Sequence, residues 1–157
     1  MSTRCAVIIR VKDEHIGKTL KFSEDSLPCK LDDWGNQSDK SKSEEVTINK
    51  PYLGIYCHND GYFDGVGSVL KELFKSYEHT LDLVLGGDCS IIWYNRVLRY
   101  ADRKNEEWEY LQPKQGDTPF EVGDMIGHNG YVYLFEDGMW KVQSGKNFAE
   151  YDENGVV

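Results

Sequence analysis

The sequence predicts an α+β fold in which an antiparallel sheet packs against one main amphipathic helix. Two observations support this fold class. Apolar runs with strand character lie towards both ends of the chain, at residues 5–11 and 131–142, and a run with helical spacing lies between them, at residues 64–77. The length of 157 residues is typical of one domain with its own core. Residues 1–157 are therefore predicted to form a single domain.

Two strands are predicted in the first third of the chain. Residues 5–11 are almost wholly apolar and rich in β-branched side chains, which favours a strand. In residues 51–58 apolar side chains recur at every second position, as on one face of a strand: Leu53, Ile55 and Cys57. The connection between these strands holds a short strand candidate at residues 18–22. Its polar part, residues 35–45, is predicted to be a mobile loop.

Residues 64–77 are the clearest helix candidate. Their apolar side chains recur at intervals of three and four and give one apolar stripe: Val66, Val69, Leu70, Leu73, Phe74 and Tyr77. Asp64 is predicted to be the N-cap, because its carboxylate can accept hydrogen bonds from amides of the first turn. A short second helix is predicted at residues 80–86, with Thr80 as its cap and a double glycine as its stop.

Short strands are predicted after the double glycine. Residues 90–94 and 97–100 are apolar and β-prone, and a single helix over residues 90–100 is the alternative. Residues 108–111 and 120–122 are two further strand candidates.

The C-terminal part is predicted to contain a β-hairpin over residues 131–142. An Asp-Gly pair at 137–138 is a strong signal for a tight turn between two strands. The polar tail beyond about residue 148 is predicted to fray.

Charge and hydropathy exclude some classes of function. The chain has 18 basic and 27 acidic residues and a formal charge of −9. Binding to duplex nucleic acid depends on clustered Lys and Arg, so direct duplex binding is not expected. Acidity instead favours solubility, or association with a basic protein surface. The apolar runs are too short to cross a bilayer and the first residues lack the features of a secretory signal, so no membrane association and a cytoplasmic location are predicted.

The cysteines are predicted to be structural. Cys5, Cys29, Cys57 and Cys89 form no C-x-x-C pair, so the spacing typical of a zinc finger is absent. Inside apolar strands a reduced thiol behaves as a small buried hydrophobic group. No cofactor and no metal are predicted.

Residues 56–65 are the most informative segment, because they are predicted to run from a strand through a turn into a helix. This order places His58, Asp60 and Tyr62 near one helix end. One interpretation is a small polar pocket with a titratable imidazole and exposed amides. The other is structural, with an Asx-type turn at Asp60, a cap at Asp64 and an imidazole that faces water. The sequence favours the structural interpretation.

Catalytic interpretations of this segment find little support. Adjacent residues on a strand point to opposite faces, so His58 cannot readily activate Cys57. Cys89 with His58 or His128 is geometrically open, yet no orienting third group can be assigned. A hard-cation site made of His58, Asp60 and Asp64 lacks any recognised loop spacing. No catalytic residue is predicted.

Trp34 stands out in the polar connection. An aromatic side chain on a mobile loop can contact a partner protein. Alternatively, it folds back over the core.

Several stretches resemble a known family. They are the opening Thr3-Arg4, the segment Tyr-Cys-His-Asn-Asp-Gly-Tyr at residues 56–62, and the Tyr-Leu-Phe-x-Asp-Gly-x-Trp run at residues 133–140. The chain resembles small uncharacterised bacteriophage and prophage proteins with a Thr-Arg start and a Tyr-Cys-His-x-Asp-Gly-Tyr motif. The resemblance covers most of the chain except residues 12–46, and Asn59 stands where the family usually has Trp.

The resemblance implies a viral origin and a setting in the cytoplasm of the infected bacterium. It implies no established activity. If the recurrent polar residues of the family converge, they form one cluster: Arg4, His58, Asp60, Tyr62, Asp102 and Arg103. Within it, Arg4 could pair with Asp60 either as part of a site or to fasten the first strand to the turn.

Three functions are compatible with these observations. The leading hypothesis is a non-enzymatic accessory protein that binds, and inhibits, a host protein such as a CRISPR- or restriction-type defence nuclease through an acidic, nucleic-acid-mimicking surface. This rests on analogy with other small acidic phage proteins. The alternative is a module that binds or sequesters a small ligand or nucleotide in the pocket around His58 and Asp60. An enzyme of unknown type comes third, and a homodimer is compatible with the sequence. The residues predicted to bind a ligand or partner are Arg4, Trp34, His58, Asp60, Tyr62, Asp102 and Arg103.

Overall fold

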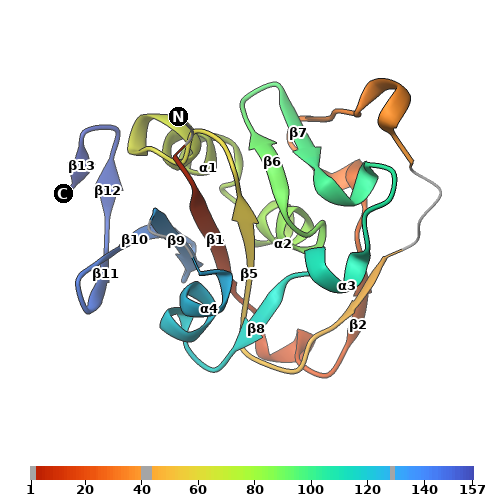
Figure 1. The fold of residues 1–157 in the computed structure, drawn as a ribbon. Coiled ribbons are helices and arrows are strands. Elements are labelled where there is room, and N and C mark those ends of the chain that lie inside the picture. The colour runs from red at the N-terminus through yellow and green to blue at the C-terminus, as the bar shows by residue number, and fades with distance from the viewer. Residues whose placement is uncertain (1–2, 40–43, 128–129) are drawn as a thin grey trace.

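The computed structural model describes residues 3–39, 44–127 and 130–157. It confirms the α+β class, with one large sheet and a few short helices (Figure 1). Over these described ranges the sheet has nine strands, eight of them in the order β11-β10-β9-β1-β5-β6-β7-β3, while β8 pairs with β5. The strands are β1 (Cys5–Arg10), β3 (Lys30–Leu31), β5 (Tyr52–Cys57), β6 (Cys89–Ile92), β7 (Arg96–Arg99), β8 (Lys114–Gly116), β9 (Tyr131–Glu136), β10 (Met139–Ser144) and β11 (Asn147–Ala149).

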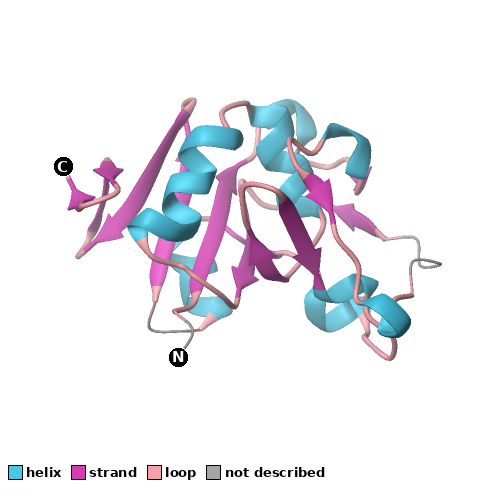
Figure 2. Ribbon diagram, turned by 90° about the horizontal axis from the view of Figure 1, so that it is seen from above, coloured by secondary structure: helices cyan, strands magenta, loops and turns pink. Residues whose placement is uncertain are grey.

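The remaining elements surround this sheet. Two small antiparallel pairs are β2 (Thr19–Lys21) with β4 (Glu45–Thr47) and β12 (Tyr151–Asp152) with β13 (Gly155–Val156). The helices are α1 (Ser68–Leu73), α2 (Tyr77–Leu85), α3 (Trp108–Leu111) and α4 (Pro119–Ile126). Figure 2 shows helices on both sides of the sheet.

The sheet is mixed, whereas the sequence predicts an antiparallel one. β1 pairs antiparallel with β5 but parallel with β9, and β5 pairs parallel with β6. The chain leaves β5, forms α1 and α2, and returns as β6, which is the helical crossover that parallel neighbours require. Alternating apolar residues report that a strand has one buried face and do not report the direction of its neighbours.

The two faces of β5 differ sharply. Leu53, Ile55 and Cys57 are fully buried in the main core together with α1 and α2. The opposite face, which we call the front face, is covered in part by α4. A Cβ at Gly54 would lie within 2.6 Å of Val122 of α4, so glycine allows this helix to pack closely on the strand.

The predicted long helix at residues 64–77 is interrupted. A π-helical turn, Phe63–Gly67, precedes α1 and is kinked at Gly65, whose backbone is not helical (φ −102°, ψ −116°). The chain leaves helical geometry again at Phe74 before α2 begins at Tyr77. The apolar stripe survives the break because Phe74 stays buried outside any helix. An apolar side chain at helical spacing therefore marks burial and does not show that the helix continues.

The predicted helix caps are also wrong. Tyr62 precedes the π-helical turn without a side-chain cap, and Asp64 lies within that turn. Ser76, rather than Thr80, caps α2, and its hydroxyl accepts from the His79 amide at 3.1 Å. Thr80 is buried inside α2 and donates to the Ser76 carbonyl at 2.8 Å.

Residues 108–111 and 120–122, predicted to be strands, lie in the helices α3 and α4. Thr118 caps α4 by accepting from the Glu121 amide at 3.1 Å, and Pro119 occupies the first turn. Thr-Pro-Phe-Glu is a capping box with proline in a favoured position, and this local signal outweighs the β propensity of Phe120 and Val122.

The other predicted strands and the hairpin are confirmed. Strands occupy most of the predicted segments at 18–22, 90–94 and 97–100, and β9 pairs antiparallel with β10 across the Asp-Gly turn. The tail is not frayed over its whole length. Tyr151 is fully buried, and its hydroxyl donates to the Gly67 carbonyl at 2.8 Å.

The predicted mobile loop is only partly described. Residues 40–43 lie outside the described residues. On either side of them, Gly35–Gln37 form a turn of 3-10 helix and Glu44 is buried.

Candidate functional site

The strand register places four polar side chains on the front face. Cys57 of β5 is the partner of Cys89 of β6, and both thiols face the main core. Because side chains alternate along a strand, the residues that flank these cysteines point to the front: Tyr56, His58, Asp88 and Ser90. The amide of His58 donates to the Cys89 carbonyl at 3.0 Å, so the pairing continues beyond the end of β5.

Asp88 is held by hydrogen bonds from three parts of the chain. The Tyr56 amide donates to Asp88 Oδ1 at 3.0 Å. The Asp88 amide donates to the Leu111 carbonyl at 2.9 Å, and the Asp88 carbonyl accepts from the Tyr100 amide at 3.1 Å. Within the described residues Oδ2 accepts no hydrogen bond. The carboxylate is therefore fixed in place with one oxygen unused.

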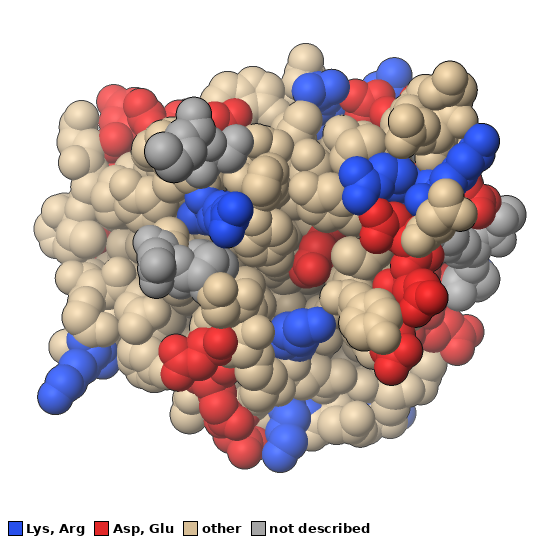
Figure 3. Space-filling model, in the orientation of Figure 1, with Lys and Arg blue, Asp and Glu red and all other residues tan. Residues whose placement is uncertain are grey.

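Asp88 lines a cavity that we call the front pocket. It has a volume of about 310 Å³ and is lined by Tyr56, Asp88, Tyr110, Lys114, Met125 and Ile126. Tyr110 and Met125 are 68% and 48% exposed, so the rim presents apolar surface to solvent. Figure 3 shows a hollow near the middle of this face, with an acidic side chain inside it and basic side chains beside it. Apolar walls around a fixed polar group are typical of ligand sites.

Burial raises the pKa of Asp88 to about 6. The Tyr56 amide and the positive charge of Lys114 oppose this increase in pKa, but burial has the larger effect. At neutral pH the side chain is mainly ionised, and near pH 6 it exchanges a proton. The front pocket therefore offers a negative charge that a hydrogen-bond donor of a ligand can stabilise.

Tyr56 connects Asp88 to His58. Its hydroxyl lies 2.7 Å from His58 Nδ1, and burial raises the pKa of the phenol. The positive charge of Arg4 lowers the pKa of the Tyr56 phenol and so opposes the effect of burial. Of the predicted site residues, Arg4 and His58 thus lie beside the front pocket.

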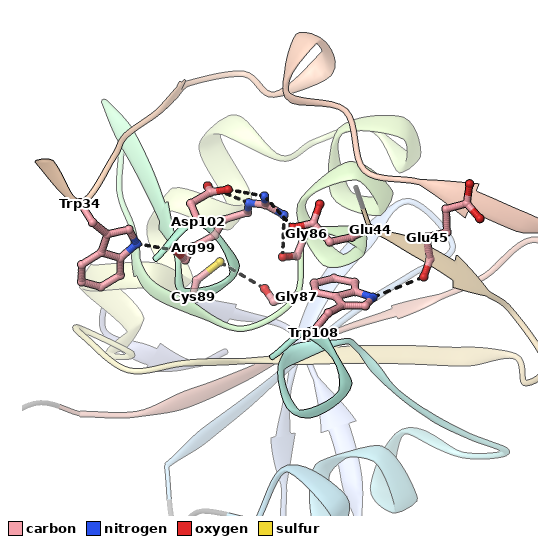
Figure 4. Close-up of polar contacts among 9 residues, drawn as sticks. All are labelled: Trp34, Glu44, Glu45, Gly86, Gly87, Cys89, Arg99, Asp102 and Trp108. Carbon is pink, nitrogen blue, oxygen red and sulfur yellow. Dashed lines mark hydrogen bonds and ion pairs between the residues drawn. The ribbon is translucent and has the colours of Figure 1, made fainter. Parts of the chain in front are cut away.

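Asp102 lies in a different place, in a set of residues that we call the buried ion cluster (Figure 4). The Arg99 guanidinium donates to Asp102 at 2.6 and 3.1 Å and to the Gly86 carbonyl at 3.0 Å. It also reaches Glu44 at 3.4 Å. All three charged side chains are almost fully buried, so the cluster holds β7 to the loop before β6 and is not exposed to a partner.

Trp34 folds back over the core. Its indole Nε1 donates to the Arg99 carbonyl at 2.6 Å, and its ring stacks on Tyr100 with the centroids 5.6 Å apart. The Arg103 guanidinium lies 4.9 Å from the Trp34 ring centroid, which is a cation–π distance. Of the two interpretations of Trp34, the structure therefore supports the packed one.

Asp60 and Tyr62 lie in the turn before the π-helical segment. Asp60 has a positive φ of 59° and is exposed, while its carbonyl accepts from the Val66 amide at 2.8 Å. Tyr62 is exposed and packs edge-on against Tyr131. In the described part of the chain, no ion pair joins Arg4 to Asp60.

The six recurrent polar residues therefore do not form one cluster. The structure keeps Arg4 and His58 close to the turn that carries Asp60 and Tyr62, since the Gly61 amide donates to the Thr3 carbonyl at 2.7 Å, and it places Asp102 and Arg103 in another part of the fold. The residues that sequence reasoning missed are Asp88, Tyr110 and Lys114. One sequence feature could have indicated Asp88, because it is an acidic residue between a double glycine and an apolar strand. No local sequence feature indicates Tyr110 or Lys114.

Two further features bear on function. Across residues 3–39, 44–127 and 130–157, no group of three or more His, Cys, Asp or Glu side chains is placed to hold a metal ion. In the same ranges, no helix has both the length and the apolar character needed to cross a membrane.

Comparison of the chain with protein families, with curated proteins and with solved structures gives no match. The resemblance to phage and prophage proteins therefore stays a prediction.

Proposed function

We propose that the protein binds a small organic ligand in the front pocket. The observation that carries this proposal is Asp88, a partly buried carboxylate that is fixed by the Tyr56 amide inside a cavity, with one oxygen that accepts no hydrogen bond from the described residues. A buried charge without a full set of partners costs stability. A carboxylate kept in this state beside an apolar rim is better suited to binding than to structure.

The pocket chemistry indicates the class of ligand. Asp88 accepts hydrogen bonds from N–H groups, and Lys114, which also lines the pocket, supplies a donor. Tyr110 and Met125 provide exposed surface against which a flat, partly apolar body can pack. The ligand is therefore a small molecule with N–H donors on the edge of a planar body, such as a nucleobase or a related heterocycle.

A ligand screen followed by titration tests this proposal. Nucleobases, nucleosides and aromatic amines are screened for an increase in melting temperature, since binding to the folded state alone must raise it. Calorimetry with the best compound then compares wild type with D88N and with the control D124N, which removes an exposed carboxylate from α4. The D88N variant is expected to bind about tenfold or more weakly, because the charged acceptor is lost.

The pH dependence gives a second readout. Affinity is expected to decrease as pH falls through about 6, where Asp88 takes up a proton and its charge is lost. A screen without any stabilising compound, or equal affinity in D88N and wild type, would contradict the proposal.

A second function, binding to a basic host protein, is favoured by a different observation. Exposed acidic side chains gather on the side of the molecule where α3 lies (Figure 3). Trp108 Nε1 donates to the Glu45 carbonyl at 3.4 Å, which places Glu45 of β4 next to the residue flanked by the exposed Glu107 and Glu109. We propose this surface as the contact for a partner such as a defence nuclease, in keeping with the predicted phage origin.

Charge reversal tests the second function. The triple variant E45K/E107K/E109K is compared with the control E153K, which changes an exposed acid in the C-terminal hairpin. Some proteins are expected to bind wild type and the control at low salt and to dissociate from them at high salt. The same proteins are not expected to bind the triple variant. Retention of the same proteins by all three would count against a role for this surface.

A further inference from the structure

Arg4 and His58 lie side by side at one end of the front face. Cys5 of β1 is the partner of Cys57 of β5, so Arg4 and His58 are the next residues along the two strands. Continued by one residue, this register places Arg4 opposite His58 on the front side, and the charge of Arg4 acts on Tyr56, the hydrogen-bond partner of His58. The backbone there is secured, since the Arg4 carbonyl accepts from the Tyr131 amide at 3.3 Å and the His58 amide donates at 3.0 Å.

Arg4 differs from every other arginine of the chain. The other four, all in the described residues, each form an ion pair with a carboxylate: Arg10 with Asp13, Arg96 with Asp32, Arg99 with Asp102 and Glu44, and Arg103 with Glu106. Arg4 is exposed and forms neither an ion pair nor a side-chain hydrogen bond with a described residue. In a chain with 27 acidic residues, an arginine without an acidic partner among the described residues needs an explanation.

His58 presents a second unused donor. Its Nδ1 is joined to the Tyr56 hydroxyl at 2.7 Å. When that hydroxyl donates, the imidazole carries its hydrogen on Nε2, which has no hydrogen-bond partner among the described residues. Tyr56 thereby sets the orientation of the imidazole, and it is a positioning residue for this end of the face.

The same tyrosine connects this end of the face to the front pocket. The Tyr56 side chain lines the pocket, and its amide holds Asp88. A ligand that reaches Asp88 with its donor edge therefore extends past Tyr56 towards Arg4 and His58. A guanidinium and an imidazole N–H suit the oxygens of a phosphate or a carboxylate.

We propose that Arg4 and His58 form an oxyanion subsite, so that the ligand of the front pocket carries a phosphate or carboxylate group. This inference rests on the proposed ligand-binding function and deepens it. The ligand class becomes a planar N–H donor linked to an anion, as in a nucleoside monophosphate or a heterocyclic carboxylic acid. The net negative charge of the chain does not prevent this, because recognition depends on these two local donors.

Titration of simple anions tests the subsite without the rest of the ligand. Backbone amide resonances of the full chain are followed by NMR during addition of inorganic phosphate, and separately of acetate, at constant ionic strength. Phosphate is expected to shift the amides of residues 3–5 and 57–61. In R4Q the affinity is expected to fall about tenfold, with no fall in D88N.

The matched control is R10Q, which removes one positive charge from the same face of the same strand at its opposite end. An equal loss in R10Q and R4Q would overturn the subsite, since a general charge effect would then explain the binding. Wild-type affinity in R4Q, or no shift with either anion, would overturn it as well. Acetate binding as tightly as phosphate supports the subsite and points to a carboxylate ligand.

Failure of the subsite and failure of the proposed function have different signatures. If phosphate binds and its binding requires Arg4, but no heterocycle binds in a way that requires Asp88, the subsite is supported and the front-pocket ligand is rejected. If a heterocycle binds in a way that requires Asp88, and an added phosphate or carboxylate group does not increase its affinity, only the subsite is rejected. A gain of about tenfold from that group, lost in R4Q, supports both.

Discussion

The protein holds charged side chains in two contrasting ways. In the buried ion cluster, Arg99 is 4% exposed, and its donors are taken up by Asp102, Glu44 and the Gly86 carbonyl. The ring of Phe22 covers the guanidinium at 3.9 Å. On the front face, Arg4 has no ion pair in the described residues, and Asp88 uses one oxygen. A charge with all its partners inside the fold serves structure, whereas a fixed charge with unused capacity is available to a ligand.

The largest expected effect comes from breaking the buried ion cluster. R99M removes the only cation between Asp102 and Glu44 among the described residues, and leaves two carboxylates buried. The free energy of unfolding is expected to fall by about 3–5 kcal/mol. Urea denaturation followed by circular dichroism measures the change.

The exposed ion pair of Arg96 with Asp32 provides the control for R99M. Because the Arg96 side chain is 44% exposed, R96Q is expected to cost less than about 1 kcal/mol. Equal losses in the two variants would mean that burial does not distinguish the two ion pairs.

Asp88 is expected to behave in the opposite way to Arg99. Its folded-state pKa of about 6 lies above the unfolded value of about 3.9, so ionisation of Asp88 costs stability. Below about pH 4 this free-energy cost is absent. It grows as pH rises from about 4 to about 6 and reaches its full size above about pH 6. In D88N the side-chain oxygen of the asparagine can still accept the hydrogen bond from the Tyr56 backbone amide.

The D88N variant is therefore expected to be more stable than wild type by about 3 kcal/mol at pH 7.5, and equal to it at pH 4. Denaturation at both pH values measures this, and a difference independent of pH would contradict it. A substitution that stabilises the fold and removes ligand binding would show that the charge is kept for function.

Trp34 tests whether an aromatic side chain on the connection is structural. W34F keeps the stacking on Tyr100 but loses the hydrogen bond from Nε1 to the Arg99 carbonyl. The free energy of unfolding is expected to fall by about 1 kcal/mol, with ligand affinity unchanged. W93F is the control, since in the described structure the Trp93 indole N–H has no acceptor. A loss of ligand affinity without a loss of stability would reverse the assignment.

The smallest expected effect on stability is that of R4Q. The Arg4 side chain is exposed and without an ion pair in the described residues, so the free energy of unfolding should change by no more than about 0.5 kcal/mol. The same denaturation experiment measures it. A loss above about 1 kcal/mol would mean that Arg4 supports the fold in the way that Arg99 does.

Much of the fold could be predicted because its signals are local. The strands at residues 5–11 and 51–58 and the hairpin at 131–142 follow from alternating apolar residues and an Asp-Gly turn, and the structure contains them. The errors also have local causes. Phe120 and Val122 have β propensity, but the Thr118–Glu121 capping box starts a helix there.

The candidate site could be predicted only in part. The sequence points to Arg4 and His58, but it groups them with Asp102, which lies in the buried ion cluster. Their actual neighbours depend on pairing between distant strands. Asp88 reaches Tyr56 because β6 returns parallel to β5 after a helical crossover, and no pattern within β5 or β6 specifies that register.

The amino-acid sequence by itself determined the α+β class, most strand positions, the acidic surface and the polar character of residues 56–65. These properties depend on side chains a few positions apart, whose periodicity and turn chemistry act locally. The tertiary structure decided which charged side chains are buried and paired and which stay accessible to a ligand. Arg99 meets Asp102 and Glu44 in the interior, while Arg4 and Asp88 remain on the uncovered part of the front face. That division follows from strand order and helix packing, because these decide which face of each strand is covered.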